Sequence, residues 1–129
     1  MTKRIVIVDD EQAARLKLRQ LLANLPKWQI VAELNSGRAL LETLNESATD
    51  VVLLDINMPG MTGIDLLKAV RASEKLRGLP VLMVTAEAKR DQIIAAAQAG
   101  VNGYVVKPFT AAALEEKIEK IFERIEATS

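Results

Sequence analysis

Short runs of β-branched residues alternate five times with stretches that carry apolar residues at helical spacing. This alternation is typical of successive βαβ units, which build a parallel sheet. The predicted strands are 4–8, 29–33, 50–54, 80–84 and 103–106. Three of them contain IVIV, VVLL and VLMV, which are apolar on both faces, so helices should cover the sheet from both sides. With right-handed crossovers, the expected fold is an α/β, doubly wound, five-stranded parallel sheet of order 2-1-3-4-5.

The helical stretches carry signals for where helices begin and end. Thr62 followed by Asp65 predicts a helix start of capping-box type, and Thr110 predicts a second N-cap. Gly100 suits the left-handed position that ends a helix. The first and last helices each show a single apolar stripe, made of Ala14, Leu18, Leu21, Leu22 and Leu25, and of Leu114, Ile118, Ile121, Phe122 and Ile125. Trp28 is expected to pack between the first helix and the second strand.

Length and charge limit the class of protein. The chain has 129 residues, close to the commonest size of one domain, so we expect a single domain over 1–129. Lysine plus arginine equal aspartate plus glutamate at 17 each, so no basic field would hold nucleic acid. The longest apolar runs are only as long as a strand, which argues against membrane spans. Acidic residues directly follow the first apolar run, which argues against a signal peptide. We expect a cytoplasmic protein.

Two residue types are missing from the chain. It contains no cysteine and no histidine. Their absence excludes thiol chemistry, zinc sites built on these residues, and every Ser-His-Asp arrangement. Chemistry by this chain must therefore use carboxylates, hydroxyls, amines and a bound metal ion.

Polar side chains stand where the predicted strands end. Asp9 and Asp10 follow the first strand, Asp55 follows the third, Thr85 the fourth and Lys107 the fifth. In a sheet of this order, the carboxyl ends of strands one, three and four lie side by side, and such sheets bind ligands there. We therefore expect three carboxylates and a hydroxyl to converge.

The converging acids admit two interpretations. Each alone could be a helix cap, as Asp9 or Glu11 could be for the first helix. As a group they would repel one another, because two carboxylates about 4 Å apart cost roughly 4 kcal/mol at an effective dielectric near 20. A hard cation relieves this repulsion, and Mg²⁺ fits best because it takes few carboxylates and leaves positions for phosphoryl oxygens. With Lys107 as a second positive group, the predicted chemistry is phosphoryl transfer to an aspartate.

Four motifs at these strand ends, VDDE, LLDINMPGMTG, VTA and VVKPF, together resemble the response-regulator receiver domain. The resemblance covers essentially the whole chain and implies the flavodoxin-like (βα)5 fold. It implies that a histidine kinase supplies a phosphoryl group to Asp55. It also implies that Mg²⁺ is held by Asp10, by Asp55, by the backbone carbonyl of Asn57 and, through water, by Asp9.

The resemblance further implies a switch near the acceptor. Lys107 would contact the phosphoryl group, and Thr85 would be drawn toward it while Tyr104 turns inward, a coupled change between two packings. Taken alone, Tyr104 could equally be half-buried packing with a wet hydroxyl. The bond between Lys107 and Pro108 would be cis.

Within the family, residues 80–125 are most similar to single-domain chemotaxis regulators. This similarity implies a monomer that binds a flagellar motor switch protein, with a phosphatase as a further partner. The partner face would comprise Arg90, Ile93, Ala97, Tyr104, Val106, Lys117 and Lys120, although a solvated helix surface would explain its lysines equally well. The first half departs from this pattern. Chemotaxis regulators usually carry an aromatic residue where Glu11 stands and a tryptophan where Ile56 stands.

Three functions remain open at this point. The leading hypothesis is a switch, not an enzyme, that works in chemotaxis and catalyses only its own phosphorylation and dephosphorylation. An alternative is the isolated receiver of a transcription factor, which would dimerise through its fourth and fifth helices. A third is a magnesium-dependent phosphohydrolase with its aspartate nucleophile on the first strand. Asp9 followed by Glu11 partly fits that motif, but the NMPG loop would go unexplained.

Overall fold

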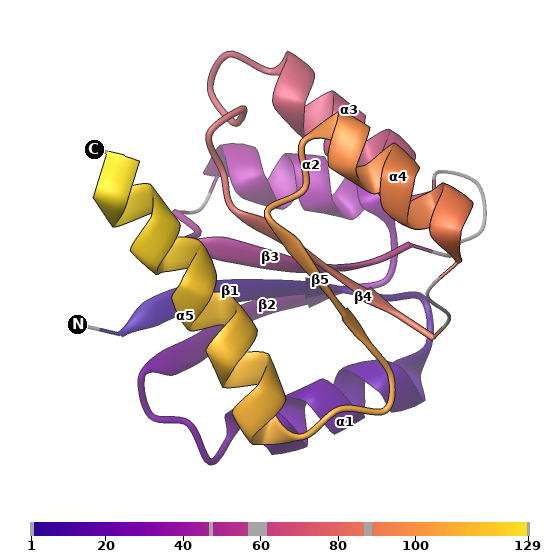
Figure 1. The fold of residues 1–129 in the computed structure, drawn as a ribbon. Coiled ribbons are helices and arrows are strands. Elements are labelled where there is room, and N and C mark those ends of the chain that lie inside the picture. Colours follow the sequence, from indigo (N-terminus) through magenta and orange to yellow (C-terminus); the bar gives the residue numbers. More distant parts are fainter. Residues whose placement is uncertain (1, 47, 57–61, 87–88, 129) are drawn as a thin grey trace.

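The computed structural model describes residues 2–46, 48–56, 62–86 and 89–128 (Figure 1). Its five strands are parallel and lie in the order β2-β1-β3-β4-β5, which confirms the predicted topology. No helix among these residues is long and apolar enough to cross a membrane. In chain order the elements are β1 (Lys3–Val8), α1 (Gln12–Leu22), β2 (Trp28–Leu34), α2 (Gly37–Glu46), β3 (Val51–Asp55), α3 (Gly63–Ala72), β4 (Val81–Thr85), α4 (Arg90–Ala99), β5 (Gly103–Val106) and α5 (Ala111–Thr128).

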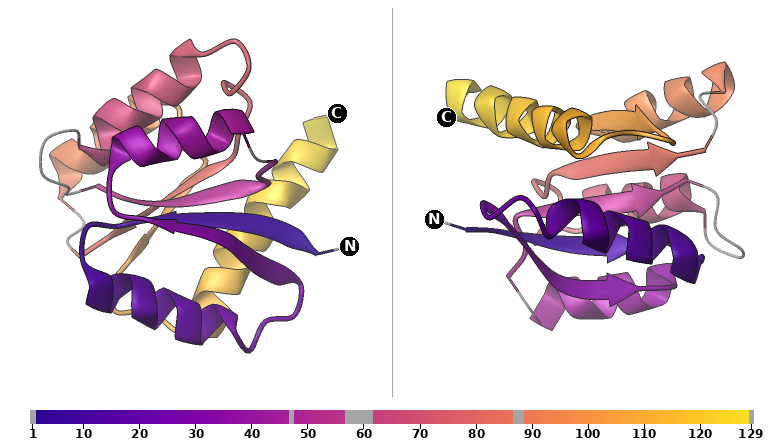
Figure 2. Two further views of the ribbon diagram at one scale, coloured as in Figure 1. Left: turned by 180° about the vertical axis from the view of Figure 1, so that it is seen from behind. Right: turned by 90° about the horizontal axis from the view of Figure 1, so that it is seen from below.

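Helices cover both faces of the sheet (Figure 2). Strand residues alternate between two apolar clusters, because successive side chains of a strand point to opposite faces. The cluster on the α1 and α5 side contains Ile5, Ile7, Val51, Leu53, Leu82, Val84, Leu18, Leu22, Leu114 and Ile118. The cluster on the side of α2, α3 and α4 contains Val6, Val8, Val52, Leu54, Met83, Leu40, Leu66, Leu67 and Ala96. This three-layer arrangement is the one predicted from strands that are apolar on both faces.

The strand bounds differ from the predicted ones by single residues. β3 begins at Val51 because the N–H of Arg4 on β1 donates to the carboxylate of Asp50 at 2.6 Å. In a regular β1–β3 ladder this N–H would donate to a backbone carbonyl. β4 begins at Val81 because Pro80 has no N–H to donate. At the other end, both strands run one residue further than predicted. Asp55 and the last residue of β4 therefore sit on the rigid sheet and not in the loops.

A β-bulge interrupts the edge strand β2. Ile5 pairs with Ile30, whereas the next residue of β1, Val6, pairs with Ala32, so Val31 is an extra residue. Because the side-chain period of a strand is two, one extra residue sends the following side chains to the opposite face. Ile30 accordingly packs in the α1 and α5 cluster, and Ala32 packs in the other cluster. The same shift directs Glu33 toward α1.

The predicted helix boundaries are confirmed. Thr62 Oγ1 accepts the N–H of Asp65 at 3.2 Å and donates to its carboxylate at 3.0 Å. Thr110 Oγ1 accepts the N–H of Ala113 at 3.1 Å. Gly100 has φ of 95°, the left-handed conformation that closes α4.

Trp28 fixes α5 to the sheet. It is the first residue of β2, and its ring stacks on Phe122 with centroids 6.2 Å apart. Its Nε1–H donates to Glu115 at 3.2 Å, and the ammonium of Lys3 lies 4.6 Å from the Phe122 centroid. Trp28 is thus a packing residue as predicted: it belongs to the apolar cluster that contains Leu18 and Leu22 of α1, and its ring also stacks on α5.

Candidate functional site

Three carboxylates meet at the carboxyl ends of the strands, the edge of the sheet that lies opposite the chain termini in Figure 1. Asp9 directly follows β1, Asp10 is the next residue, and Asp55 ends β3. One carboxylate oxygen from each lies within 4.8 Å of the others. Asp9 and Asp55 are buried, at 1% and 6% exposure, while Asp10 is exposed. Within the described part of the chain, no other group of three such ligands comes together.

The sheet holds these acids in place. The N–H of Asp9 donates to the carbonyl of Leu34 at 3.0 Å, which extends the β1–β2 pairing by one residue. Asp55 pairs with Val84 in the β3–β4 ladder and follows four fully buried apolar residues. The N–H of Gly63 donates to the carbonyl of Ile56 at 2.9 Å, so α3 begins against the end of β3. The carboxylates therefore come from backbone that the core fixes.

Every polar group of Asp9 has a protein partner. Besides its N–H, its Oδ1 accepts the N–H of Glu11 at 2.9 Å and its Oδ2 accepts from Lys107 Nζ at 3.1 Å. Its backbone carbonyl accepts from Arg15 Nη1 at 2.6 Å. The ammonium of Lys107 balances the buried charge, as a buried carboxylate requires. The helix-cap interpretation is thus partly correct for Asp9, whereas the side chain of Glu11 makes no cap hydrogen bond.

Lys107 and Thr85 complete the cluster of strand-end residues. Thr85 is fully buried, and its carbonyl accepts the N–H of Lys107 at 2.7 Å, which joins the ends of β4 and β5. The bond from Lys107 to Pro108 is cis, as the resemblance implied. The structure therefore brings the three aspartates and Lys107 together, and it places the end of β4 beside Lys107. Asn57, expected to offer a backbone carbonyl, lies outside the described residues.

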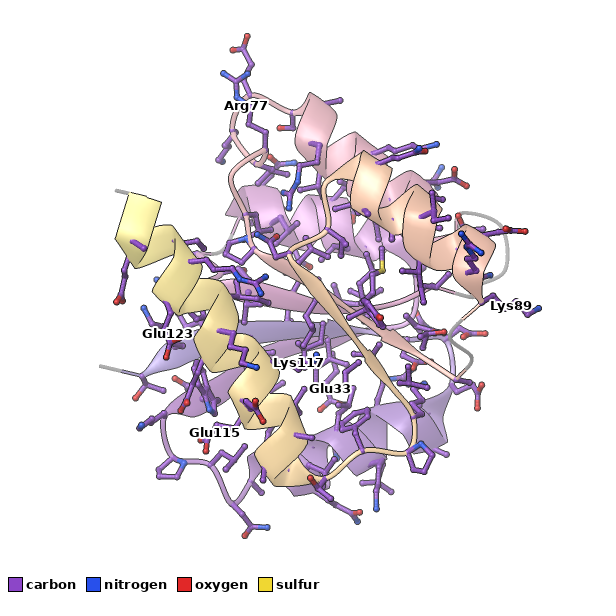
Figure 3. The ribbon with its side chains drawn as sticks, in the orientation of Figure 1. Glu33, Arg77, Lys89, Glu115, Lys117 and Glu123 are labelled. Carbon is purple, nitrogen blue, oxygen red and sulfur yellow. The ribbon has the colours of Figure 1, made fainter. Side chains whose placement is uncertain are left out.

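The predicted partner face lies on α4, β5 and α5. Tyr104 is 39% exposed on β5, and the ammonium of Lys117 lies 5.9 Å from its ring centroid. Figure 3 shows Lys117 on α5. Ile93 is only half-buried, and its neighbour Ile94 is the large apolar side chain of α4 that is exposed, at 45%. Of the other predicted residues, the exposed ones are Arg90, Ala97 and Lys120, and Val106 is half-buried.

Sequence reasoning missed the arginines of α1. Arg19 makes a two-pronged ion pair with Glu33, at 2.7 and 2.8 Å. The hydrogen bond from Arg19 holds the pKa of Glu33 below its ordinary value, although burial acts against it, and the charges of Arg19 and Arg15 contribute. In sequence, these arginines look like ordinary solvated helix charges. Their partners depend on the fold: the bulge in β2 brings Glu33 to Arg19, and the end of β1 brings the carbonyl of Asp9 to Arg15.

A hollow lies at the amino ends of β3 and β4, away from the carboxylate cluster. It has a volume of about 720 Å³ and is lined by Lys3, Asp50, Lys75 and Phe122 among others. Burial raises the pKa of Asp50, but two hydrogen bonds from Arg4 outweigh it and hold that pKa below its ordinary value. No metal-ligand group lies there among the described residues.

The donor set suits a hard divalent cation. Carboxylate oxygens are the ligands that Mg²⁺ and Ca²⁺ take, and Mg²⁺ needs only one or two of them. Two buried carboxylates beside an exposed one leave one side of the cluster open to solvent and ligands. The Asp9, Asp10 and Asp55 group could thus hold a metal ion that also contacts a bound phosphoryl group.

Comparisons with known proteins identify relatives of this chain. The model of the response regulator receiver domain matches residues 5–119. The chain is 62% identical to chemotaxis protein CheY of Pseudomonas aeruginosa over 122 residues, which are 95% of this chain and 98% of that protein. It is 57% identical to chemotaxis protein CheY-3 of Vibrio cholerae over 122 residues, which are 95% of this chain and 93% of that protein. Matches of this length span both halves of the chain, including the first half with Glu11 and Ile56.

Solved structures show the same fold. The chemotaxis response regulator CheY4 of Vibrio cholerae superimposes with a TM-score of 0.83 at 27% identity, covering 94% of this chain and 99% of that one. A LuxR-family two-component response regulator from Aurantimonas gives 0.85 at 30% identity, covering 94% of this chain and 85% of that one. Motifs, strand-end geometry and similarity over nearly the whole length lead to one conclusion: this chain belongs to the response regulator receiver domain family and is closely related to CheY chemotaxis regulators.

Proposed function

We propose that this chain is a single receiver domain over residues 1–129 that accepts a phosphoryl group on Asp55 from a histidine kinase. Its setting would be a cytoplasmic two-component pathway of chemotaxis. The observation that carries this proposal is the position of Asp55. This buried acid ends a central strand and shares a 4.8 Å cluster with Asp9 and Asp10, beside the ammonium of Lys107. A cation with a phosphoryl group would relieve the repulsion among these acids, and functional sites are where such groups gather.

Each residue has a role in this transfer. A carboxylate oxygen of Asp55 bonds to phosphorus while the bond from phosphorus to the donor histidine nitrogen breaks, and that nitrogen keeps the electron pair. Mg²⁺ would be held by Asp10 and Asp55, with Asp9 through water and the carbonyl of Asn57, and would neutralise charge on the phosphoryl oxygens. Lys107 would exchange its contact with Asp9 for one with the phosphoryl group. Water later hydrolyses the acyl phosphate, so self-catalysis is the only catalysis proposed.

The β4–β5 pairing supports the proposed switch. Thr85 pairs with Val106, two residues after Tyr104 on the same strand. A shift of Thr85 toward a phosphoryl group on Asp55 would therefore change the packing beside Tyr104. The tyrosine ring, now exposed next to Lys117, would turn inward and alter the face formed by α4, β5 and α5.

Intact-protein mass after treatment with Mg²⁺ and a small acyl phosphate tests the acceptor. One added phosphoryl group is expected on the wild-type protein, because Asp55 offers the nucleophile. No added mass is expected in Asp55→Asn or after removal of the metal with a chelator. Asp65→Asn is the matched control, because Asp65 is an exposed acid of α3 that is already used by its helix cap, and it should label like wild type.

Equal labelling of Asp55→Asn would contradict the assignment. Rapid multiple turnover of a phosphomonoester that survives this substitution would favour the phosphohydrolase alternative instead.

Binding to a flagellar motor switch peptide tests the output. The phosphorylated protein is expected to bind such a peptide about tenfold more tightly than the unphosphorylated protein, a typical coupling between two sites. Fluorescence anisotropy with a labelled peptide measures both affinities. Lys117→Ala should weaken binding, whereas Lys68→Ala, an exposed lysine of α3 outside this face, should not.

Equal affinity for the two forms would leave no signal to transmit. Sedimentation of the phosphorylated protein as a concentration-dependent dimer would favour the transcription-factor alternative over the proposed monomer.

A further inference from the structure

Arg15 reaches from α1 back to the end of β1. Its backbone N–H donates to the carbonyl of Glu11 at 3.2 Å, so it lies one turn into the helix. Its Nη1 donates to the backbone carbonyl of Asp9 at 2.6 Å, in a partly buried contact. Hydrogen bonds from a charged donor at this distance are among the stronger ones in proteins. The guanidinium is therefore held firmly against the strand end.

The carbonyl that Arg15 holds belongs to the peptide group between Asp9 and Asp10. Fixing the plane of this peptide fixes the backbone from which the side chain of Asp10 leaves. The carboxylate of Asp9 is also held by Glu11 and Lys107. By contrast, the exposed carboxylate of Asp10 has no hydrogen bond or ion pair with any residue that the structure describes. The orientation of Asp10 thus depends on the backbone that Arg15 secures.

The charge of Arg15 also acts on Glu33, whose main partner is Arg19. The bulge at Val31 turns Glu33 toward α1, and Figure 3 labels it beside that helix. The charge of Arg15 contributes to lowering the pKa of Glu33, so the two groups attract each other. Arg15 therefore bonds to a backbone carbonyl of the site, and it lines a hollow together with Glu33 outside the site. This placement suits a group that holds the backbone more than one that neutralises the metal ligands.

We infer that Arg15 is a positioning residue, which sets the orientation of Asp10 toward Mg²⁺ by holding the carbonyl of Asp9. The inference rests on the proposed function, because it concerns the same metal site. A positioning role and a purely electrostatic role predict opposite changes in Mg²⁺ affinity when Arg15 is replaced. A cation near three carboxylates repels Mg²⁺, so its removal should tighten Mg²⁺ binding if charge alone mattered. Loss of positioning should weaken it.

Isothermal titration of the unphosphorylated protein with Mg²⁺ measures this effect. Arg15→Met is expected to raise the Kd for Mg²⁺ by about tenfold, which is at the low end for partners that orient a metal ligand. The matched control is Lys17→Met, which removes one positive charge from an exposed position of the same helix and leaves the Arg19–Glu33 ion pair in place, and its Kd should change by less than about twofold because exposed charges are screened. At saturating Mg²⁺, labelling of Arg15→Met by an acyl phosphate should return close to the wild-type rate.

Urea unfolding of each variant verifies that it folds, and Arg15→Lys keeps the charge if Arg15→Met does not fold. Because a lysine lacks the planar fork, Arg15→Lys should also bind Mg²⁺ more weakly than wild type. If the wild-type protein binds Mg²⁺ and labels on Asp55 while these Arg15 variants bind Mg²⁺ as tightly or more tightly, the positioning role is wrong and the proposed function stands. If the wild-type protein binds no Mg²⁺, the proposed function and the role of Arg15 both fail.

Discussion

The Gly63→Ala variant is expected to lose about 3 kcal/mol of unfolding free energy, the upper end for an overpacked core position. A Cβ at Gly63 would overlap the carbonyl oxygen of Asp55 and lie 2.8 Å from the Cα of Ile56. Both are backbone atoms, so no side-chain rotation can relieve the clash. The start of α3 would have to separate from the end of β3, and the hydrogen bond from Gly63 to Ile56 would lengthen. Urea denaturation followed by circular dichroism measures the loss.

The same variant should also lose function. Because the end of β3 carries the proposed acceptor Asp55, its displacement should lower the rate of labelling by an acyl phosphate. Gly78→Ala is the matched control, because a Cβ at Gly78 would meet no atom within 4 Å, and its stability should change by less than about 0.5 kcal/mol. A urea midpoint of Gly63→Ala equal to that of the wild-type protein would contradict the close approach of α3 to β3.

The Arg71→Met variant is expected to lose about 2 to 4 kcal/mol, because one guanidinium serves several acceptors at the amino ends of β4 and β5. From the last turn of α3, it donates to the carbonyls of Arg77, Leu79 and Gly100 at 3.0, 2.7 and 3.0 Å. It also donates to the side chain of Asn102 at 2.8 Å, which in turn accepts the N–H of Val81. Burial lowers the pKa of Arg71. Methionine would leave these acceptors without their donor, and the contacts to the Leu79 carbonyl and the Asn102 side chain are part-buried.

Arg77→Met is the control for this experiment. Arg77 lies on the exposed loop after α3, where Figure 3 labels it at the rim of the molecule, and its backbone carbonyl still accepts from Arg71 in the variant. Urea unfolding should show little change for Arg77→Met. Amide hydrogen exchange at Val81 should become faster in Arg71→Met, since that N–H bonds to the Asn102 side chain that Arg71 holds. Unchanged exchange at Val81 would show that Asn102 stays in place without Arg71.

The sheet order and the strand-end acids could be predicted because they follow from local patterns. Apolar runs on both faces identify the central strands, and parallel strands bring their carboxyl ends to one edge. Asp9, Asp55 and Thr85 could therefore be placed at one edge of the sheet from the sequence. Strand bounds were wrong by one residue at Asp50 and Pro80. The bound at Asp50 depends on its carboxylate, which accepts a hydrogen bond in place of a backbone carbonyl, and the bound at Pro80 depends on its missing N–H. Neither feature changes the pattern of apolar residues.

The residues that could not be predicted act through geometry between distant segments. Arg71 and Arg15 bond mainly to backbone carbonyls, which every residue carries, so no sequence pattern marks their partners. The exposure of Ile94 in place of Ile93 depends on how α4 is rotated on the sheet. Trp28 could be recognised as packing, but its stacking on Phe122 depends on how α5 crosses the start of β2.

The extra residue in β2 also bears on solubility. β2 is an edge strand, and an open edge presents N–H and C=O groups that a strand of another molecule can use to extend the sheet. The bulge at Val31 breaks the regular spacing of these groups and increases the local twist, so a straight incoming strand finds no continuous register. The extra residue Val31 therefore has two effects: it turns Glu33 toward α1, and it protects the exposed edge of β2 against intermolecular β-aggregation.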